Sequence, residues 1–343
     1  MIAYGGFQLE LSELVEKSQR NYGLKIDSIE RIKNAYKILS NGKAYCLKIV
    51  KYNYGHSLFI ISAMKYLTEK GFEKIPQIIK TQNGNDYICV GNYYAYLTDW
   101  IRSRQCNFDN PLDISMASVK LAELHKKSEG FTITTEMEPR VGWFKWVETF
   151  NTRRDEMSDF KSRINKKAFK SEFDCIYLEN VENEKNRARI SSLDLINSEY
   201  FNKMSVEITK NGFCHHDYAH HNLLIQDNGI ANVIDFDYCI LDTHLHDLAS
   251  LLIRKMKNGK WDLGSANLIL EAYDSCYKLV QSDIPIMAAL MEFPQDFWQV
   301  GIQYYWEKQK WGEEFFINKL NKIIEDRDER QEFIENFKLV RFK

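Results

Sequence analysis

The sequence predicts an α+β protein with two lobes. A small antiparallel β-sheet with one main helix is expected over residues 1–101, and a larger, mostly helical part over residues 102–343. Three observations predict this division. Short segments of alternating apolar and polar residues, separated by turns, dominate the stretch from Ile26 to Trp100. After that stretch the apolar residues recur at helical spacing. A polar β-hairpin over residues 213–237 then interrupts the helices.

The composition is that of an ordered, soluble chain. Its 343 residues are 44% hydrophobic and 27% charged, which is ordinary for a globular protein of two lobes. A net charge of −2 provides no general attraction to nucleic acid or to anionic membranes, so neither is expected as a partner. We also expect no signal peptide, because the start lacks a basic segment followed by an apolar stretch, and no transmembrane segment, because no apolar run is long enough to span a bilayer. The seven cysteines are scattered and form no Cys-x-x-Cys pair, which favours reduced thiols.

The first lobe is predicted to alternate between strands and helices. A leading helix is expected over residues 8–22, and a second, amphipathic helix ends near Gly71, which suits a C-terminal helix cap. The predicted strands occupy 26–32, 35–39, 44–50, 86–91 and 92–100, with a turn at Ser40-Asn41-Gly42-Lys43. The lobe therefore carries a meander closed by an Asn-Gly turn.

The second lobe is predicted to be helical on both sides of the hairpin. Apolar spacing indicates helices over 114–128, 143–163, 190–211, 248–256, 267–281, 297–306 and 315–337. The basic stretch 161–170 is interpreted as a solvated helix face in preference to a substrate patch. Asp247 precedes an apolar helical run and is predicted to be its N-cap.

The hairpin gathers oxygen-bearing side chains that suit a cation and a phosphate. Asp217 and Asn222 are separated by four residues, so a short loop can bring the amide oxygen back toward the carboxylate. Asp235 and Asp237 follow an apolar strand and would point the same way if that strand continued. Carboxylate and amide oxygens are the ligands that Mg²⁺ prefers, so Asn222, Asp235 and Asp237 are the candidate metal ligands. Turn capping is the simpler alternative for each residue taken alone.

Asp217, His215 and Lys48 are candidates for roles in catalysis and phosphate binding beside these metal ligands. Asp217 could accept the proton of a hydroxyl that attacks a γ-phosphoryl group. His215 is a candidate member of the catalytic group, and its expected role is to hold the loop by hydrogen bonds to the backbone. Lys48 lies within the apolar strand Cys46–Val50 and would by itself be an ordinary strand lysine. A nucleotide kinase, however, needs one cation on the α- and β-phosphates, and Lys48 could supply it.

These residues resemble the protein-kinase-like superfamily, in its aminoglycoside phosphotransferase and choline kinase branch. The match consists of His215-His216-Asp217-x₄-Asn222, Ile234-Asp235-Phe236-Asp237 and Asp247-Leu248-Ala249. Within this branch the chain is most similar to the CotS-type spore coat proteins of endospore-forming bacteria. That similarity is carried by Tyr45-Cys-Leu-Lys-Ile-Val-Lys-Tyr, Tyr96-Leu-Thr-Asp-Trp-Ile and Leu121-Ala-Glu-Leu-His-Lys-Lys-Ser-Glu-Gly, among other stretches along nearly the whole chain.

The resemblance implies a bilobal fold that binds ATP and Mg²⁺. It places the adenine against a hinge formed by Asp99, Trp100 and Ile101, and the phosphates on Lys48. It makes Asp217 the base, with Asn222 and Asp235 on the metal. The implied reaction transfers the γ-phosphoryl group to a small molecule that bears a hydroxyl or an amine. The implied locations are the mother-cell cytoplasm and the spore coat, with other coat proteins as partners.

Three departures from the superfamily pattern bear on activity. The hairpin from Arg31 to Lys43 contains no G-x-G-x-x-G, so phosphates would lack a glycine cradle. The predicted helix before Gly71 has Glu69 as its only acid, at its far end, and the usual glutamate partner of Lys48 is missing. His216 stands where a small residue often precedes the aspartate. The alternative function is therefore a catalytically weak or inactive kinase-like component of the spore coat.

Overall fold

An antiparallel sheet forms the core of the N-terminal part of the chain. The computed structural model describes residues 11–72 and 74–341. The strands of this sheet are β1 (Ile26–Ile32), β2 (Ala35–Ser40), β3 (Lys43–Val50), β4 (Ile78–Ile79), β5 (Ile88–Val90) and β6 (Tyr93–Asp99). Their order is β1-β2-β3-β6-β4, with β5 also paired to β6. The predicted turn at Asn41-Gly42 joins β2 to β3, and both of its residues have the positive φ that such two-residue turns require.

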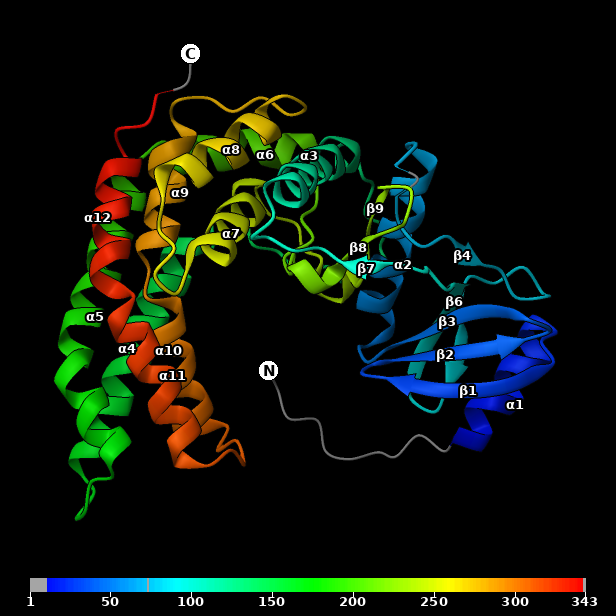
Figure 1. Cartoon of the computed structure of the whole chain (residues 1–343), viewed down its shortest axis with the longest axis horizontal. Coiled ribbons are helices and arrows are strands. Elements are labelled where there is room, and N and C mark those ends of the chain that lie inside the picture. Colours follow the sequence, from blue (N-terminus) through cyan, green and yellow to red (C-terminus); the bar gives the residue numbers. More distant parts are fainter. Residues whose placement is uncertain (1–10, 73, 342–343) are drawn as a thin grey trace. The chain divides into compact units, whose positions relative to one another are not determined.

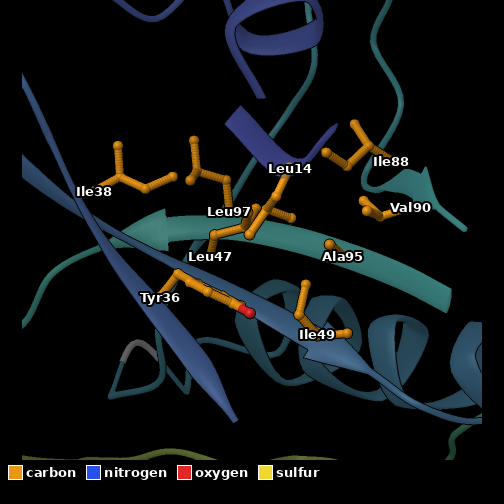
Figure 2. Close-up of a cluster of buried hydrophobic side chains, with 9 residues drawn as sticks. All are labelled: Leu14, Tyr36, Ile38, Leu47, Ile49, Ile88, Val90, Ala95 and Leu97. Atoms are coloured by element: carbon orange, nitrogen blue, oxygen red, sulfur yellow. The ribbon is translucent and has the colours of Figure 1, made fainter. Parts of the chain in front are cut away.

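One face of this sheet carries a cluster of buried apolar side chains. Figure 2 shows Leu14 of α1 (Leu11–Tyr22) lying on side chains from the strands, including Leu47 and Leu97. Leu47 and Ile49 of β3 belong to this cluster. Because side chains alternate along a strand, Lys48 must face the opposite side of the sheet. Residues 8–10 of the predicted leading helix lie outside the described residues.

Helices α2 (Tyr54–Glu69) and α3 (Pro111–Ser128) pack on each other within the same part of the chain. Helix α2 begins where the Asn53 side chain accepts the His56 amide hydrogen, and Gly71 follows it with a φ of 78°. Helix α3 begins at Asn110, whose side chain accepts the Leu112 amide hydrogen. Gly71 thus follows the helix as predicted, whereas the N-caps Asn53 and Asn110 were not singled out from the sequence.

A second, three-stranded sheet carries the polar hairpin. It consists of β7 (Arg104–Gln105), β8 (Leu223–Ile225) and β9 (Ala231–Val233), all antiparallel. The predicted turn contains Gly229, with a φ of 78°, and is closed by a bond from the Gln226 amide to the Ile230 carbonyl. The short strand β7 was not predicted, because two exposed residues, Arg104 and Gln105, give no periodic signal.

The remaining helices pack on one another. They are α4 (Trp146–Asn165), α5 (Glu172–Asn197), α6 (Tyr200–Lys210), α7 (Leu245–Met256), α8 (Leu263–Asp274), α9 (Asp283–Glu292), α10 (Gln295–Gly301), a π-helical segment (Ile302–Trp306), α11 (Glu313–Glu325) and α12 (Arg327–Phe337). Helices α4 and α5 pack together over a long contact, and α9 packs between α5 and α7 (Figure 1). Aromatic stacking fills this packing: Tyr304 lies on Phe173 at 4.0 Å between ring centroids.

Several predicted helix limits were wrong. Residues 172–189 of α5 and all of α9 were missed. Helix α9 is buried around most of its circumference, so it shows no apolar stripe from which a period can be read. The predicted helix over 190–211 is broken at Ser198, and the one over 315–337 is broken at Asp326. The basic stretch 161–170 contains the end of α4 followed by a loop.

Asp247 is not a helix N-cap. Helix α7 begins two residues earlier, with His244 in the cap position, and Asp247 lies inside its first turn with its side chain buried. A carboxylate in the first turn still interacts favourably with the positive end of the helix dipole, which explains why an acid occurs there.

The contacts between residues divide the chain into two compact units. The described residues up to Val141, together with Asn211–Leu241, form a strand-bearing unit; Gly142–Lys210 and the described residues from Asp242 onward form a helical unit. The predicted lobe boundary near residue 101 stays a prediction. No helix among the residues the structure describes is both long and apolar enough to cross a membrane.

Candidate active site

The hairpin register brings Asn222 next to Asp235. Leu223 of β8 pairs with Val233 of β9, and one residue further out the Ile234 amide donates to the Asn222 carbonyl at 2.9 Å. The Asn222 side-chain amide donates to both the main-chain oxygen and Oδ2 of Asp217, at 2.9 and 3.1 Å. Asp217, Asn222 and Asp235 are thus assembled by one short hairpin and the loop before it.

His215 ties the loop before β8 to the end of β9. Its Nδ1 accepts the Asp217 amide hydrogen at 3.3 Å, so its Nε2 carries the hydrogen and donates to the Ile234 carbonyl at 3.0 Å. The ring is buried beside Phe236, with 4.9 Å between ring centroids. His215 therefore holds the two segments together through the backbone.

Two residues of the site have left-handed backbone geometry. His216 has a φ of 65° and Asp235 a φ of 67°. Such values are uncommon for residues other than glycine and often occur at functional sites. Strand β9 ends at Val233 and Asp235 is left-handed, so the condition under which Asp235 and Asp237 would point the same way, a strand continued to Asp237, is not met.

Lys48 joins the two aspartates. Its Nζ lies 2.7 Å from Asp235 Oδ1 and 3.1 Å from Asp237 Oδ2. The Lys48 side chain is only 8% exposed. The convergence of Asp235 and Asp237 arises from the left-handed turn at Asp235 and the 3₁₀ turn Phe236–Tyr238 that follows it.

Burial and neighbouring charges shift the pKa values of Lys48, Asp235 and Asp237 in different directions. Burial favours neutral Lys48, but the attraction of Asp237 and Asp235 outweighs it and raises the pKa of the amine above its ordinary value. Burial also opposes ionisation of Asp235, yet the Lys48 ammonium lowers the pKa of that carboxyl. For Asp237 burial prevails over Lys48, and the neighbouring charge of Asp235 adds to it, which raises its pKa to about 6.

The three predicted hinge residues follow β6. Asp99 and Trp100 line an open cavity of about 620 Å³, together with Lys37, Leu39 and Ala44 among others. The Trp100 amide donates to the Ala44 carbonyl at 3.0 Å, and Lys37 Nζ lies 5.1 Å from the centre of the Trp100 ring. The Asp99 carboxylate is exposed and pairs with Lys43 at 2.8 Å.

The third of these residues, Ile101, does not line the cavity. Its carbonyl accepts the Ser103 hydroxyl hydrogen at 3.3 Å. The structure thus brings Asp99 and Trp100 to one cavity and leaves Ile101 beside it.

Lys37, Leu39 and Ala44 of the cavity lining lie on the same face of the sheet as Lys48. Lys37 pairs with Cys46, Leu39 pairs with Ala44, and residues directly opposite one another share a face. Cys46 and Lys48 are two residues apart on β3 and also share that face. From Ala44 to Lys48 the strand advances about 13 Å, a span that suits an extended nucleotide.

The oxygen atoms near Lys48 fit a divalent cation. Asp237 Oδ1 is buried and has no hydrogen-bond partner within the described part of the chain. The Asn222 amide nitrogen is directed at Asp217, which leaves the amide oxygen available as an acceptor. Together with the Asp235 carboxylate, these hard oxygen donors are of the kind that Mg²⁺ binds. Asn222, Asp235 and Asp237 are therefore the residues that would hold the ion.

Two residues near the site were not singled out from the sequence. Lys37 lines the cavity, and Arg140 lies over the rings of Tyr52 and Tyr238, at 4.9 and 5.4 Å from their centres. The alternation within β2 could have indicated Lys37, because it shares the face of Ala35. Arg140 follows no periodic pattern and could not have been found this way.

Comparison with solved structures defines the class of fold, that of the kinase-like small-molecule phosphotransferases. An aminoglycoside phosphotransferase from Alicyclobacillus acidocaldarius superposes with a TM-score of 0.82 at 20% identity, over 98% of both chains. A spectinomycin phosphotransferase, solved with ADP and spectinomycin, superposes with a TM-score of 0.72 at 16% identity, over 97% of this chain and 100% of that one. The predicted mixed α+β, kinase-like fold is confirmed.

The chain belongs to the family described as "Spore coat putative kinase YutH", whose model matches residues 16–337. Spore coat protein S of Bacillus subtilis (strain 168) is 23% identical over 280 residues, which cover 81% of this chain and 79% of that protein. The resemblance to spore coat proteins within the aminoglycoside phosphotransferase and choline kinase branch is thereby confirmed.

Proposed function

We propose that the protein binds ATP with Mg²⁺ and transfers the γ-phosphoryl group to a hydroxyl or an amine of a small molecule. The observation that carries the proposal is the set of close contacts of Lys48 with Asp235 and Asp237, beside Asp217 and Asn222. The cavity lined by Asp99 and Trp100 supplies room for the base and ribose of a nucleotide. Its relatives include a phosphotransferase solved with ADP.

Each residue has a distinct task in this proposal. Lys48 has three N–H donors, of which two are used by the aspartates, so one is left for a phosphate oxygen. Asp217 accepts the proton of the acceptor hydroxyl as its oxygen attacks, and Asn222 keeps that carboxylate oriented. Bound Mg²⁺ would neutralise the charge that develops on the phosphates.

Two substitutions test the proposal by separating binding from chemistry. Asp235→Ala should abolish Mg²⁺-dependent ATP binding, because it removes a metal ligand and the nearest partner of Lys48. Asp217→Asn should keep nucleotide binding and reduce ATP turnover by 10² or more, because the base is lost. Calorimetry and thermal shift measure the binding, and ADP release measures the turnover.

An exposed aspartate provides the matched control. Asp227 lies in the turn between β8 and β9, so Asp227→Ala and Asp227→Asn should leave binding and turnover unchanged. If the unmodified protein gives neither heat nor a thermal shift with millimolar Mg-ATP, the proposed activity is excluded.

A kinase-like structural component of the coat is the second candidate function. The β1–β2 connection favours it: Ile32 pairs directly with Ala35, so Lys33 and Asn34 form a tight turn with no glycine to wrap phosphates. Nucleotide binding without turnover, in the unmodified protein as in Asp217→Asn, would favour this candidate. In both cases we place the protein at the spore coat, in contact with other coat proteins, on the strength of its coat relative. Fractionation of spores would test that location.

A further inference from the structure

Lys48 finds its acidic partners in an unusual part of the fold. In kinase-like enzymes a glutamate on the helix after the lysine strand forms an ion pair with that lysine. Here α2 occupies that position in the chain, and its only acid, Glu69, is exposed at its last residue. Among the described residues, the carboxylates within reach of Lys48 Nζ come instead from Asp235 and Asp237.

The two aspartates differ in exposure and in the backbone that holds them. Asp235 is 24% exposed at its side chain and follows the strand beside Asn222, where a metal ligand is needed. Asp237 is 11% exposed and lies within the 3₁₀ turn that packs on α2. Lys48 is itself buried, so its ammonium needs a counter-charge when Asp235 turns to a metal.

The turn that carries Asp237 is firmly held. Phe236 is completely buried, its ring packs beside His215, and the Cys239 amide closes the turn on the Phe236 carbonyl at 3.0 Å. Asp237 Oδ2 is thereby fixed 3.1 Å from Lys48 Nζ without any contribution from the tip of the hairpin.

We propose that Asp237 is the positioning residue for Lys48 and takes the place of the missing helix glutamate. It holds the ammonium in place and directs it at the phosphates, while Asp235 and Asn222 serve the metal. This inference rests on the proposed nucleotide function. In this inference the main role of Asp237 is its ion pair with Lys48. If Asp237 served only as a metal ligand, Asp235 alone would hold Lys48.

A double-mutant cycle on ADP binding tests the assignment, because chelator removes the contribution of any metal. Calorimetry with ADP in EDTA would compare the unmodified protein with Lys48→Ala, Asp237→Asn and the double variant. If Asp237 positions Lys48, Asp237→Asn should weaken ADP binding about tenfold. In the Lys48→Ala background the same substitution should weaken ADP binding less than twofold further. Asp237→Glu should keep the ADP affinity within about threefold of that of the unmodified protein, because it retains a carboxylate.

Manganese binding to the nucleotide-free protein supplies a second measurement. Asp235→Asn should lower the Mn²⁺ affinity more than tenfold, and Asp237→Asn should lower it distinctly less than Asp235→Asn does. Asp227→Asn serves as the control in both assays. ADP binding in EDTA that is unchanged or tighter in Asp237→Asn overturns the inference and leaves the proposed function standing. Absence of ADP and ATP binding by the unmodified protein overturns both.

Discussion

At the scale of single residues, Asp242 carries the clearest consequence for pH. It is buried in the helical unit, where Oδ2 accepts the Trp146 indole hydrogen at 2.9 Å and Oδ1 accepts the Thr243 amide hydrogen at 2.8 Å. Burial raises the pKa of Asp242 to about 6, against the attraction of His246 and with a smaller contribution from Asp247. The folded protein therefore holds this proton more tightly than the unfolded chain does.

Acidification should consequently remove a cost that Asp242 imposes at neutral pH. Because its folded pKa lies above the unfolded value, its contribution to the free energy of unfolding rises as pH falls from about 6 toward 4, by on the order of 3 kcal/mol. Asp242→Asn lacks this response. Its stability deficit relative to the unmodified protein should grow as urea unfolding is measured from pH 7.5 down to 4.5.

A surface carboxylate provides the comparison for this measurement. Asp155 lies on α4 with a side chain that is 72% exposed, so Asp155→Asn controls for the loss of one charge. A deficit of Asp242→Asn that is constant over this pH range, or that shrinks toward acid, would contradict the prediction.

Residue-level patterns singled out side chains that the structure brings together, but not the geometry that brings them together. Asp217 and Asn222 meet as their spacing suggested, because four intervening residues fit a loop and a 3₁₀ turn. Asp235 and Asp237 also meet at one point, but through a left-handed residue and not through a continued strand. The left-handed backbone at Asp235 depends on tertiary contacts, and the intrinsic propensities of Asp and Phe do not predict it.

At the scale of elements, the start of α5 depends on a reciprocal cap. Ser171 Oγ accepts the Asp174 amide hydrogen at 3.3 Å, and Asp174 Oδ2 accepts the Ser171 amide hydrogen at 3.0 Å. Ser171→Ala should lower the free energy of unfolding by about 1 kcal/mol, because one amide at the helix start loses its acceptor. Thermal or urea unfolding would measure the loss.

The same substitution on an exposed helix face isolates the capping effect. Ser205 lies on α6 and donates only to the Phe201 carbonyl four residues earlier, at 3.0 Å. Ser205→Ala should therefore change stability by less than about 0.5 kcal/mol. Equal losses at Ser171 and Ser205 would show that the cap contributes nothing specific.

Elements with a strong local signal were predictable, and buried ones were not. The Asn41-Gly42 turn and the 223–233 hairpin follow from turn residues between alternating strands. Helix α9 escaped prediction because burial on most sides removes the polar stripe that reveals a helix. The break at Ser198 is likewise invisible in the apolar spacing, since α5 and α6 each continue a helical period.

At the scale of the whole molecule, every residue proposed to touch the nucleotide or the metal belongs to the strand-bearing unit. Bound Mg-ATP should therefore slow hydrogen exchange chiefly in β3, in residues 213–222 and in residues 234–241, because it suppresses local opening there. Peptides from α5 and α12 in the helical unit should change much less. Mass spectrometry of the exchanged peptides would measure this distribution.

The Asp235→Ala protein is the control for that distribution, because it should show no nucleotide-dependent protection in either unit. Protection concentrated in α4 and α5 would contradict the placement of the site. The division into two units could not be read from the sequence, since residues 211–241 join the strand-bearing unit from far along the chain.

The left-handed backbone at His216 and Asp235 has an evolutionary consequence. Each costs on the order of 1 kcal/mol relative to glycine, which adopts this geometry freely. A lineage that retained the fold only as building material would gain stability by drifting to glycine at these positions. A lineage that still transfers phosphoryl groups would have to keep the aspartate at 235. Substitution at that position among descendants of a common ancestor would thus mark the branch on which catalysis was abandoned.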